Sequence, residues 1–174
     1  GQELLRDRLS DFLADNKRLK NLMVEIAGGQ YVMESSSRDG IFSGTITLTD
    51  EQAAKYRNGS YLKYRIVTAA GDTREFAGTA ILVEGGSVCV ISDIDDTIKV
   101  SNVSDKKELL KNVFSRPYQA TEGMPVYYRD LAEKGAKFFY VSASPIQLYR
   151  PLHEFMLESG YPQGSISLRD FYAK

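Results

Sequence analysis

The residues best suited to chemistry lie between Ser92 and Ile98, where three aspartates occur within four positions. The apolar run Val88 to Ile91 comes directly before them and predicts a buried strand that ends at this acidic cluster. In extended backbone, Asp93 and Asp95 point to the same side because side chains alternate between the two faces of a strand. Two carboxylates that converge in this way could transfer a phosphoryl group, one by attacking phosphorus and the other by protonating the departing alkoxide.

The acidic cluster also predicts a bound cation. Carboxylates this close repel one another unless solvent or a cation screens them. Oxygen ligands suit Mg²⁺, which typically takes one or two carboxylates and keeps waters and phosphate oxygens as its other ligands. The alternative is an acidic, solvated loop, but Asp-x-Asp-x-Thr directly after a buried strand favours the functional interpretation. Asp96 should point away from Asp93 and Asp95, and we interpret it as a supporting residue.

Three segments of the chain are expected to hold this cluster. Residues 1–23 contain an amphipathic helix from about residue 3, with Leu5, Leu9, Phe12 and Leu13 on one stripe. Residues 24–86 alternate between apolar and polar side chains, as in 42–48, and predict a small, sandwich-like antiparallel β unit. Residues 87–174 alternate apolar runs with helical patterns, which is typical of a parallel α/β sheet.

Within the α/β segment, the predicted elements have definite bounds. Strands are expected at 88–91, 138–141 and 166–168, and helices at 106–114, 124–134 and from Pro145 to about Ser159. Ser142 ends the second strand, and since parallel strands share an edge, its hydroxyl should lie near Asp93. Ser144 is expected to cap the last helix before Pro145, a role that competes with phosphate binding.

The acidic motif is similar to that of a known superfamily. Asp93-Ile94-Asp95-Asp96-Thr97 resembles the first motif of the haloacid dehalogenase superfamily of aspartate-nucleophile phosphatases. From about residue 88 to 171, the chain resembles the catalytic domain of the actin-patch phosphatidate phosphatase family, relatives of the lipins. The resemblance rests on these blocks: SDIDDTIKVSNV, ELLKNVF, GMPVYYRDLA, FFYVSASPIQLY and YPQGSISLRDF. It implies a partial Rossmann-like domain of three parallel strands with helices, preceded by the β unit and the first helix.

The resemblance also implies a role for each matching residue. Asp93 would be the nucleophile that forms an aspartyl-phosphate, and it would bind Mg²⁺ as well. Asp95 would act as general acid and then base, with its backbone carbonyl on the metal. Ser142 and Thr97 would bind the phosphate, and Thr97 would also steady the loop. The implied function is that of a Mg²⁺-dependent phosphatidate phosphatase.

Two further motifs of the superfamily have no match at the expected places. One is a Lys that neutralises the transferred phosphoryl group, and the other is a later acidic strand end. Lys99, Lys111 and Lys174 do not lie in the matching position, and none is assigned. We therefore expect a fragment of a longer phosphatase that turns over weakly or not at all alone, with an apolar sheet edge left exposed.

Composition excludes several other classes of protein. The 174 residues carry 22 basic and 23 acidic side chains, so no bulk positive charge indicates a nucleic-acid partner. A single cysteine, Cys89, excludes an internal disulfide and is expected to be buried, and a single histidine, His153, excludes a multi-histidine metal site. No apolar run approaches the roughly 20 residues that cross a bilayer.

Alternative functions stay open at this point. We expect phosphatidate or another phosphomonoester as ligand, a cytoplasmic location and peripheral membrane contact, without nucleic acid. The first alternative is a phosphatase for a different, soluble phosphoester. The second is a non-catalytic module that binds lipid or protein.

Overall fold

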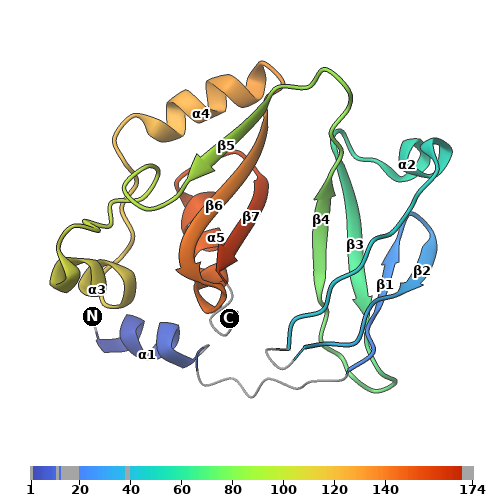
Figure 1. Ribbon diagram of the computed structural model, residues 1–174, viewed down its shortest axis with the longest axis horizontal. Coiled ribbons are helices and arrows are strands. Elements are labelled where there is room, and N and C mark those ends of the chain that lie inside the picture. The colour runs from blue at the N-terminus through green and yellow to red at the C-terminus, as the bar shows by residue number, and fades with distance from the viewer. Residues whose placement is uncertain (1, 11, 13–19, 38–39, 170–174) are drawn as a thin grey trace. The chain divides into compact units, whose positions relative to one another are not determined.

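The computed structural model describes residues 2–10, 12, 20–37 and 40–169 of the chain. The chain divides into two compact units, one formed by residues 1–14 and 85–174 and the other by residues 15–84. Figure 1 shows a parallel sheet with helices in the first unit and an antiparallel sheet in the second. The predicted α/β fold class, with three parallel strands, an antiparallel β unit and an N-terminal helix, is confirmed.

The α/β unit is built on a parallel sheet with strand order β5-β6-β7. The strands are β5 (Cys89–Asp93), β6 (Lys137–Pro145) and β7 (Gly164–Arg169). The helices are α1 (Gln2–Ser10), α3 (Lys106–Phe114), α4 (Met124–Glu133), the short 3₁₀ helix η2 (Ile146–Leu148) and α5 (Tyr149–Glu158). The bounds of α3 and α4 agree with the predicted helices, and α3 begins where the Asp105 carboxylate accepts the backbone N–H groups of Lys107 and Glu108.

The core of this unit packs against one face of the parallel sheet. Phe138 and Tyr140 of β6 are almost fully buried, and they pack with Ile94 and Tyr128. On the opposite face, Ile91 is 77% exposed, and Cys89 is exposed as well. The expectation of a continuously buried strand with a buried Cys89 is therefore wrong, because the alternation of side chains along β5 places these residues on the face that the core does not cover.

The last helix begins later than the sequence pattern predicts. Strand β6 continues to Pro145, which lies opposite Arg169 of β7, and α5 begins only at Tyr149. Pro145 has an extended backbone, with φ −59° and ψ 145°. The fixed φ of proline fits an extended segment as well as a first helical turn. Ser144 is therefore not a helix cap, and its hydroxyl is available for another contact.

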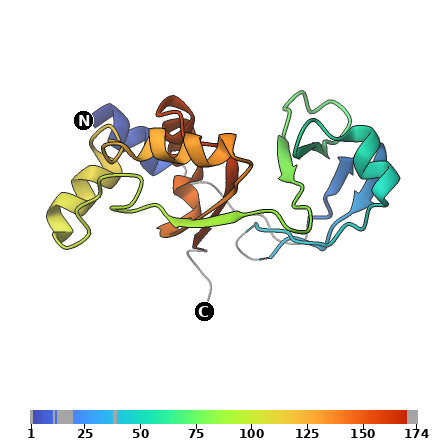
Figure 2. The ribbon, with the colours of Figure 1, turned by 90° about the horizontal axis from the view of Figure 1, so that it is seen from above.

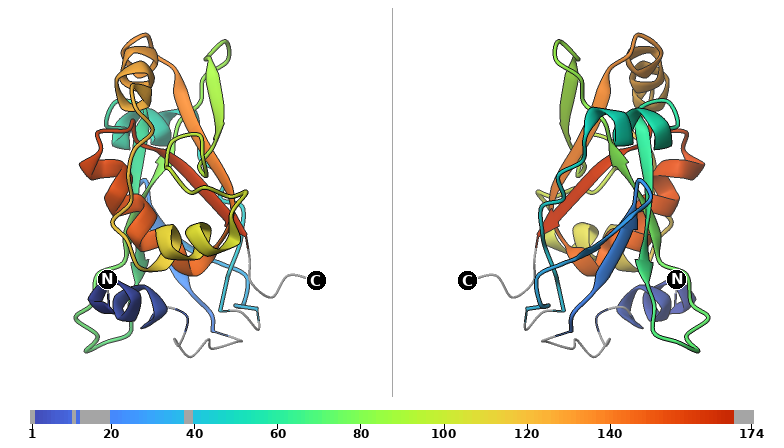
Figure 3. Two further views of the ribbon diagram at one scale, coloured as in Figure 1. Left: turned by 90° about the vertical axis from the view of Figure 1, so that its left-hand side faces the viewer. Right: turned by 90° about the vertical axis from the view of Figure 1, so that its right-hand side faces the viewer.

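The N-terminal helix α1 is shorter than predicted and packs on α3. It ends at Ser10, residues 20–22 are not helical, and residues 13–19 lie outside the described part of the chain. The side chain of Arg8, on α1, is only 4% exposed. It donates hydrogen bonds to the carbonyl oxygens of Val113 (2.6 Å) and Arg116 (3.0 Å). Burial lowers the pKa of Arg8. Figure 3 shows α1 beside α3, and this contact ties the start of the chain to the α/β unit.

The second unit is an antiparallel sheet with strand order β2-β1-β3-β4. Its elements are β1 (Met23–Ile26), β2 (Gly29–Val32), α2 (Asp50–Tyr56), β3 (Tyr61–Val67) and β4 (Ala77–Ile81). Helix α2 lies beside the start of β3 (Figure 2). It begins with a capping box between Thr49 and Gln52, a helix start that was not predicted from the sequence. The predicted strand at 42–48 is wrong, because this extended segment joins neither sheet.

Candidate active site

The carboxyl ends of β5 and β6 bring the predicted site residues to one edge of the sheet. Asp93 is the last residue of β5 and lies opposite Val141 of β6, so Ser142 follows one position further along. The Ser142 hydroxyl donates a hydrogen bond to Asp95 Oδ2 at 2.7 Å. The structure therefore places Ser142 and the acidic cluster together, as the parallel register requires.

Asp93 is the open carboxylate of the cluster. Its side chain is exposed, and the Thr97 hydroxyl donates to Asp93 Oδ2 at 3.3 Å. The next residue, Ile94, is completely buried and fixes the strand end in the core. The Thr97 hydroxyl thus contacts the predicted nucleophile, which stays accessible to a substrate.

Asp95, in contrast, has both carboxylate oxygens engaged. Oδ1 accepts a hydrogen bond from Ser101 Oγ (2.6 Å) and pairs with Lys99 Nζ (2.9 Å). Oδ2 accepts hydrogen bonds from the hydroxyls of Ser142 (2.7 Å) and Ser144 (3.1 Å). Burial raises the pKa of Asp95, but the hydrogen bonds and the Lys99 charge outweigh burial and lower this pKa to about 2.

Two residues that contact Asp95 have no role in the sequence prediction: Ser101 was not identified, and Lys99 was left unassigned. The Lys99 side chain is 1% exposed, hydrogen-bonds to Ser101 and lies 4.9 Å from the centre of the Tyr118 ring. The sequence feature that could have identified Lys99 is its place between the apolar Ile98 and Val100, because a charged side chain there needs a buried partner. Of the other lysines considered, Lys111 pairs with Glu108 on α3, and Lys174 lies outside the described residues.

Asp96 organises the loop that follows the motif. Its carboxylate accepts the backbone N–H groups of Ser101 (2.6 Å), Asn102 (2.7 Å) and Val103 (2.8 Å). Its own backbone is left-handed, with φ 58°, a conformation that aspartate tolerates better than most residues. These contacts hold Ser101 where its hydroxyl reaches Asp95.

A cavity of about 470 Å³ opens at Asp93 and Asp95. Its remaining walls are mostly apolar, and most of them come from α3, from the end of β6 and from η2. They are formed by Val103, Leu109, Leu110, Val113, Phe114, Ala143, Ser144, Pro145 and Leu148. The geometry therefore combines a charged end with an apolar wall, as an amphiphilic ligand requires.

In this arrangement, Asp93 is the side chain of the acidic cluster that could bind Mg²⁺. Among the described residues, no group of three acidic, histidine or cysteine side chains could hold a metal ion. Asp93 is exposed and accepts a hydrogen bond from Thr97 on Oδ2, whereas both oxygens of Asp95 are occupied by Lys99 and three serine hydroxyls. Since Mg²⁺ is often held by one or two carboxylates with waters and phosphate oxygens, Asp93 is compatible with this ion.

Acid should weaken this site in a defined range of pH. The pKa of Asp95 is lowered from 3.8 to about 2, so its ionised form stabilises the fold fully above about pH 4. We expect about 2 kcal/mol of the free energy of unfolding to be lost as the pH falls from about 4 to below 2. Urea unfolding of the wild type and of Asp95→Asn across this range checks the effect. A stability difference between the two proteins that does not change with pH would contradict it.

The comparisons with known proteins agree with this geometry. The family described as "Phosphatidate phosphatase APP1, catalytic domain" matches residues 88–174. The protein "Phosphatidate phosphatase APP1" of Saccharomyces cerevisiae (strain ATCC 204508 / S288c) is 38% identical over 86 residues. That alignment covers 47% of this chain and 14% of the yeast protein. The matched segment begins just before β5 and contains the acidic cluster, Ser142 and the cavity. The chain therefore belongs to the phosphatidate phosphatase APP1 catalytic domain family.

Proposed function

We propose that this chain hydrolyses the phosphate monoester of phosphatidate through an aspartyl-phosphate on Asp93. The observation that carries the proposal is the contrast between two neighbouring carboxylates. Asp93 is open to the cavity, while Asp95 is held by Lys99 and serine hydroxyls at its rim. One carboxylate is thus free to attack, and the other is positioned for proton transfer.

In the first step, a carboxylate oxygen of Asp93 forms a bond to phosphorus while the bond from phosphorus to the glycerol oxygen breaks. The glycerol alkoxide takes a proton from Asp95. In the free protein Asp95 is ionised, because its pKa is about 2. The negative charges of a bound phosphate raise the pKa of a neighbouring carboxyl, so substrate binding favours uptake of the required proton.

In the second step, water attacks the phosphorus of the aspartyl-phosphate, and Asp95 accepts a proton from this water. The bond from phosphorus to the Asp93 oxygen breaks, and inorganic phosphate leaves. Mg²⁺, with Asp93 among its ligands and the Asp95 backbone carbonyl as a second predicted ligand, would screen the charge of the phosphate and of the acidic cluster. The Ser142 hydroxyl donates to Asp95 in the free protein and is the proposed phosphate contact once Asp95 has taken up its proton, while Thr97 steadies Asp93.

The wall of the cavity supports a lipid substrate. Leu110 of α3 and Val103 are 59% and 51% exposed, and both line the cavity that opens at Asp93. Lys106 and Lys107 lie exposed on the same helix. No helix among the described residues is long and apolar enough to cross a bilayer. We therefore propose peripheral contact with an anionic membrane, in which α3 meets the lipid and the phosphate reaches Asp93.

A comparison of substrates tests the lipid assignment. We expect Leu110→Ser to lower kcat/KM for dioctanoyl phosphatidate about tenfold, because about 1.5 kcal/mol of apolar contact with an acyl chain is lost. The value for p-nitrophenyl phosphate should not change. Leu157→Ser, a change at a similarly exposed leucine of α5 outside this cavity, is the control and should leave both values unchanged.

The same assay separates the alternative functions. Faster release of phosphate from glucose 6-phosphate than from dioctanoyl phosphatidate would favour a phosphatase for soluble esters. Binding to phosphatidate vesicles without release of phosphate at any Mg²⁺ concentration would favour a non-catalytic lipid-binding module. An equal loss on both substrates in Leu110→Ser would show that Leu110 supports the fold and makes no selective lipid contact.

A further inference from the structure

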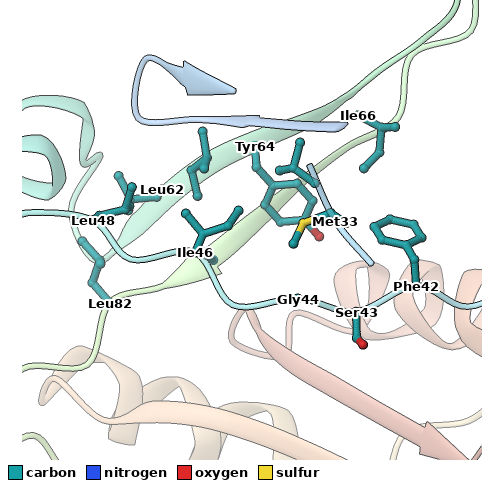
Figure 4. A pocket seen from close by; sticks show the side chains of 13 residues that line it. Met33, Phe42, Ser43, Gly44, Ile46, Leu48, Leu62, Tyr64, Ile66 and Leu82 are labelled. Atoms are coloured by element: carbon teal, nitrogen blue, oxygen red, sulfur yellow. The ribbon is translucent and has the colours of Figure 1, made fainter. Parts of the chain in front are cut away.

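A second cavity, of about 520 Å³, lies entirely within the antiparallel β unit. One wall is the apolar face of the sheet, and the other is the extended segment 42–48 (Figure 4). The lining residues are Val24, Ile26, Met33, Phe42, Ser43, Gly44, Ile46, Leu48, Leu62, Tyr64, Ile66, Ala80 and Leu82. None of them takes part in the proposed phosphatase chemistry.

The volume and the lining favour an apolar ligand. Protein interiors are densely packed and contain few voids larger than a water molecule, whereas ligand pockets typically measure about 300–1,000 Å³. Among the described residues that line it, only Ser43 and Tyr64 are polar, and the Ser43 hydroxyl points away from the cavity (Figure 4) and donates to Glu34 at 3.2 Å. A water molecule needs two to four polar partners, so this lining suits hydrocarbon better than a chain of ordered waters.

The cavity is elongated along β3. In Figure 4, Leu48 and Leu82 lie at one end, Phe42 and Ile66 lie at the other, and Tyr64 is between them. The β3 residues that line it run from Leu62 to Ile66, and four residues of a strand span about 13 Å. A space of this length suits an extended hydrocarbon chain better than a compact ring.

The segment 42–48, which covers the cavity, is held in place mainly by its own side chains. Phe42, Gly44, Ile46 and Leu48 face the cavity in alternation, but the segment joins neither sheet. Near its start, the backbone N–H of Glu34 donates to the carbonyl oxygen of Ser43 at 3.1 Å. A cover without ladder hydrogen bonds can be displaced by a ligand without disrupting a sheet.

We propose that this cavity binds one unbranched acyl chain, carried by a fatty acid or by a lysophospholipid. Methylenes of the chain pack between β3 and the cover, and Met33, which contacts Gly44 across the cavity, adjusts to them. The polar end of the ligand stays at the opening. This site acts independently of the acidic cluster, so Asp93→Asn should bind the same chains with the same affinity.

Isothermal titration calorimetry with the full chain tests the proposal. Alkyl carboxylates of six to fourteen carbons, used below their micelle concentrations, should bind with a stoichiometry of about one. The affinity should rise about fourfold for each methylene and then level off when the chain fills the cavity. Dodecanoate and a twelve-carbon lysophosphatidylcholine distinguish a free fatty acid from a phospholipid as the preferred ligand, and tighter binding of either supports the proposal.

A cavity-filling substitution locates the binding site. Ala80→Leu enlarges a side chain that lines the cavity and should weaken dodecanoate binding at least tenfold, with an unchanged or higher Tm. Thr79→Leu, which places the same side chain on the opposite, exposed face of β4, is the matched control and should bind normally. If Ala80→Leu does not fold, Ile46→Phe fills the cavity from the cover, outside the sheet.

Three results would overturn the proposal. The first is the absence of saturable binding for every chain length, which would be expected if the space is a packing defect or accepts a polypeptide segment. The second is binding that Ala80→Leu and Ile46→Phe leave unchanged, since the chains would then adsorb elsewhere. Loss of binding in Asp93→Asn would also contradict it, because it would place the chain at the acidic cluster.

Discussion

Asp93→Asn should lower the rate of phosphate release from dioctanoyl phosphatidate by at least about a thousandfold. The amide of asparagine is similar in shape to the carboxylate but does not attack phosphorus. Asp93 is exposed, and its side chain accepts a hydrogen bond from Thr97, so the substitution should leave the free energy of unfolding nearly unchanged. The loss therefore reports on chemistry rather than on folding.

Single-turnover measurements with enzyme in excess suit this test, because they detect even slow release. With ³²P-labelled substrate, acid quenching should retain label on the wild type, and hydroxylamine should remove it, as expected of an acyl phosphate. Asp93→Asn should retain no label. Asp130→Asn, a change at an exposed residue of α4, is the control and should behave like the wild type. Release at the normal rate in Asp93→Asn would mean that water attacks directly or that another residue is the nucleophile.

The part of the site that depends on regular secondary structure could be predicted from the sequence. The alternation of apolar runs and helices predicted the parallel pairing, and the parallel register places Asp93 and Ser142 at one edge. The motif itself indicated which residues could react. These features follow from local periodicity and from the short list of ways in which parallel strands connect.

The remaining features depend on contacts between distant residues. Ser144 had the pattern of a helix cap, but the continuation of β6 to Pro145 places its hydroxyl on Asp95, 49 positions away. Cys89 lies in an apolar run, and only the tertiary packing decides which face of β5 the core covers. The segment 42–48 alternates like a strand, yet pairing partners cannot be deduced from alternation alone.

Lys99→Met should reduce the free energy of unfolding by about 3 kcal/mol at pH 7. The Lys99 side chain is 1% exposed and the Asp95 side chain 17%, so removal of the cation leaves a carboxylate shielded from water without its charged partner. Three serine hydroxyls would still donate to Asp95, but neutral hydrogen bonds do not replace an ion pair at 2.9 Å. Urea unfolding measures the loss, and Lys107→Met, at an exposed lysine of α3, should change stability by less than about 0.5 kcal/mol.

The double variant Lys99→Met with Asp95→Asn tests whether the loss arises from this pair. Each single variant leaves one charge buried without its partner, whereas the double variant removes both, so it should be more stable than the sum of the single effects predicts. The cost of Lys99→Met should also shrink in acid, because Asp95 without its cation has a higher pKa and becomes neutral before the wild-type group does. Additive losses that do not change with pH would instead assign Lys99 to hydrocarbon packing against Tyr118, where its charge is not needed to hold Asp95 at the edge of the site.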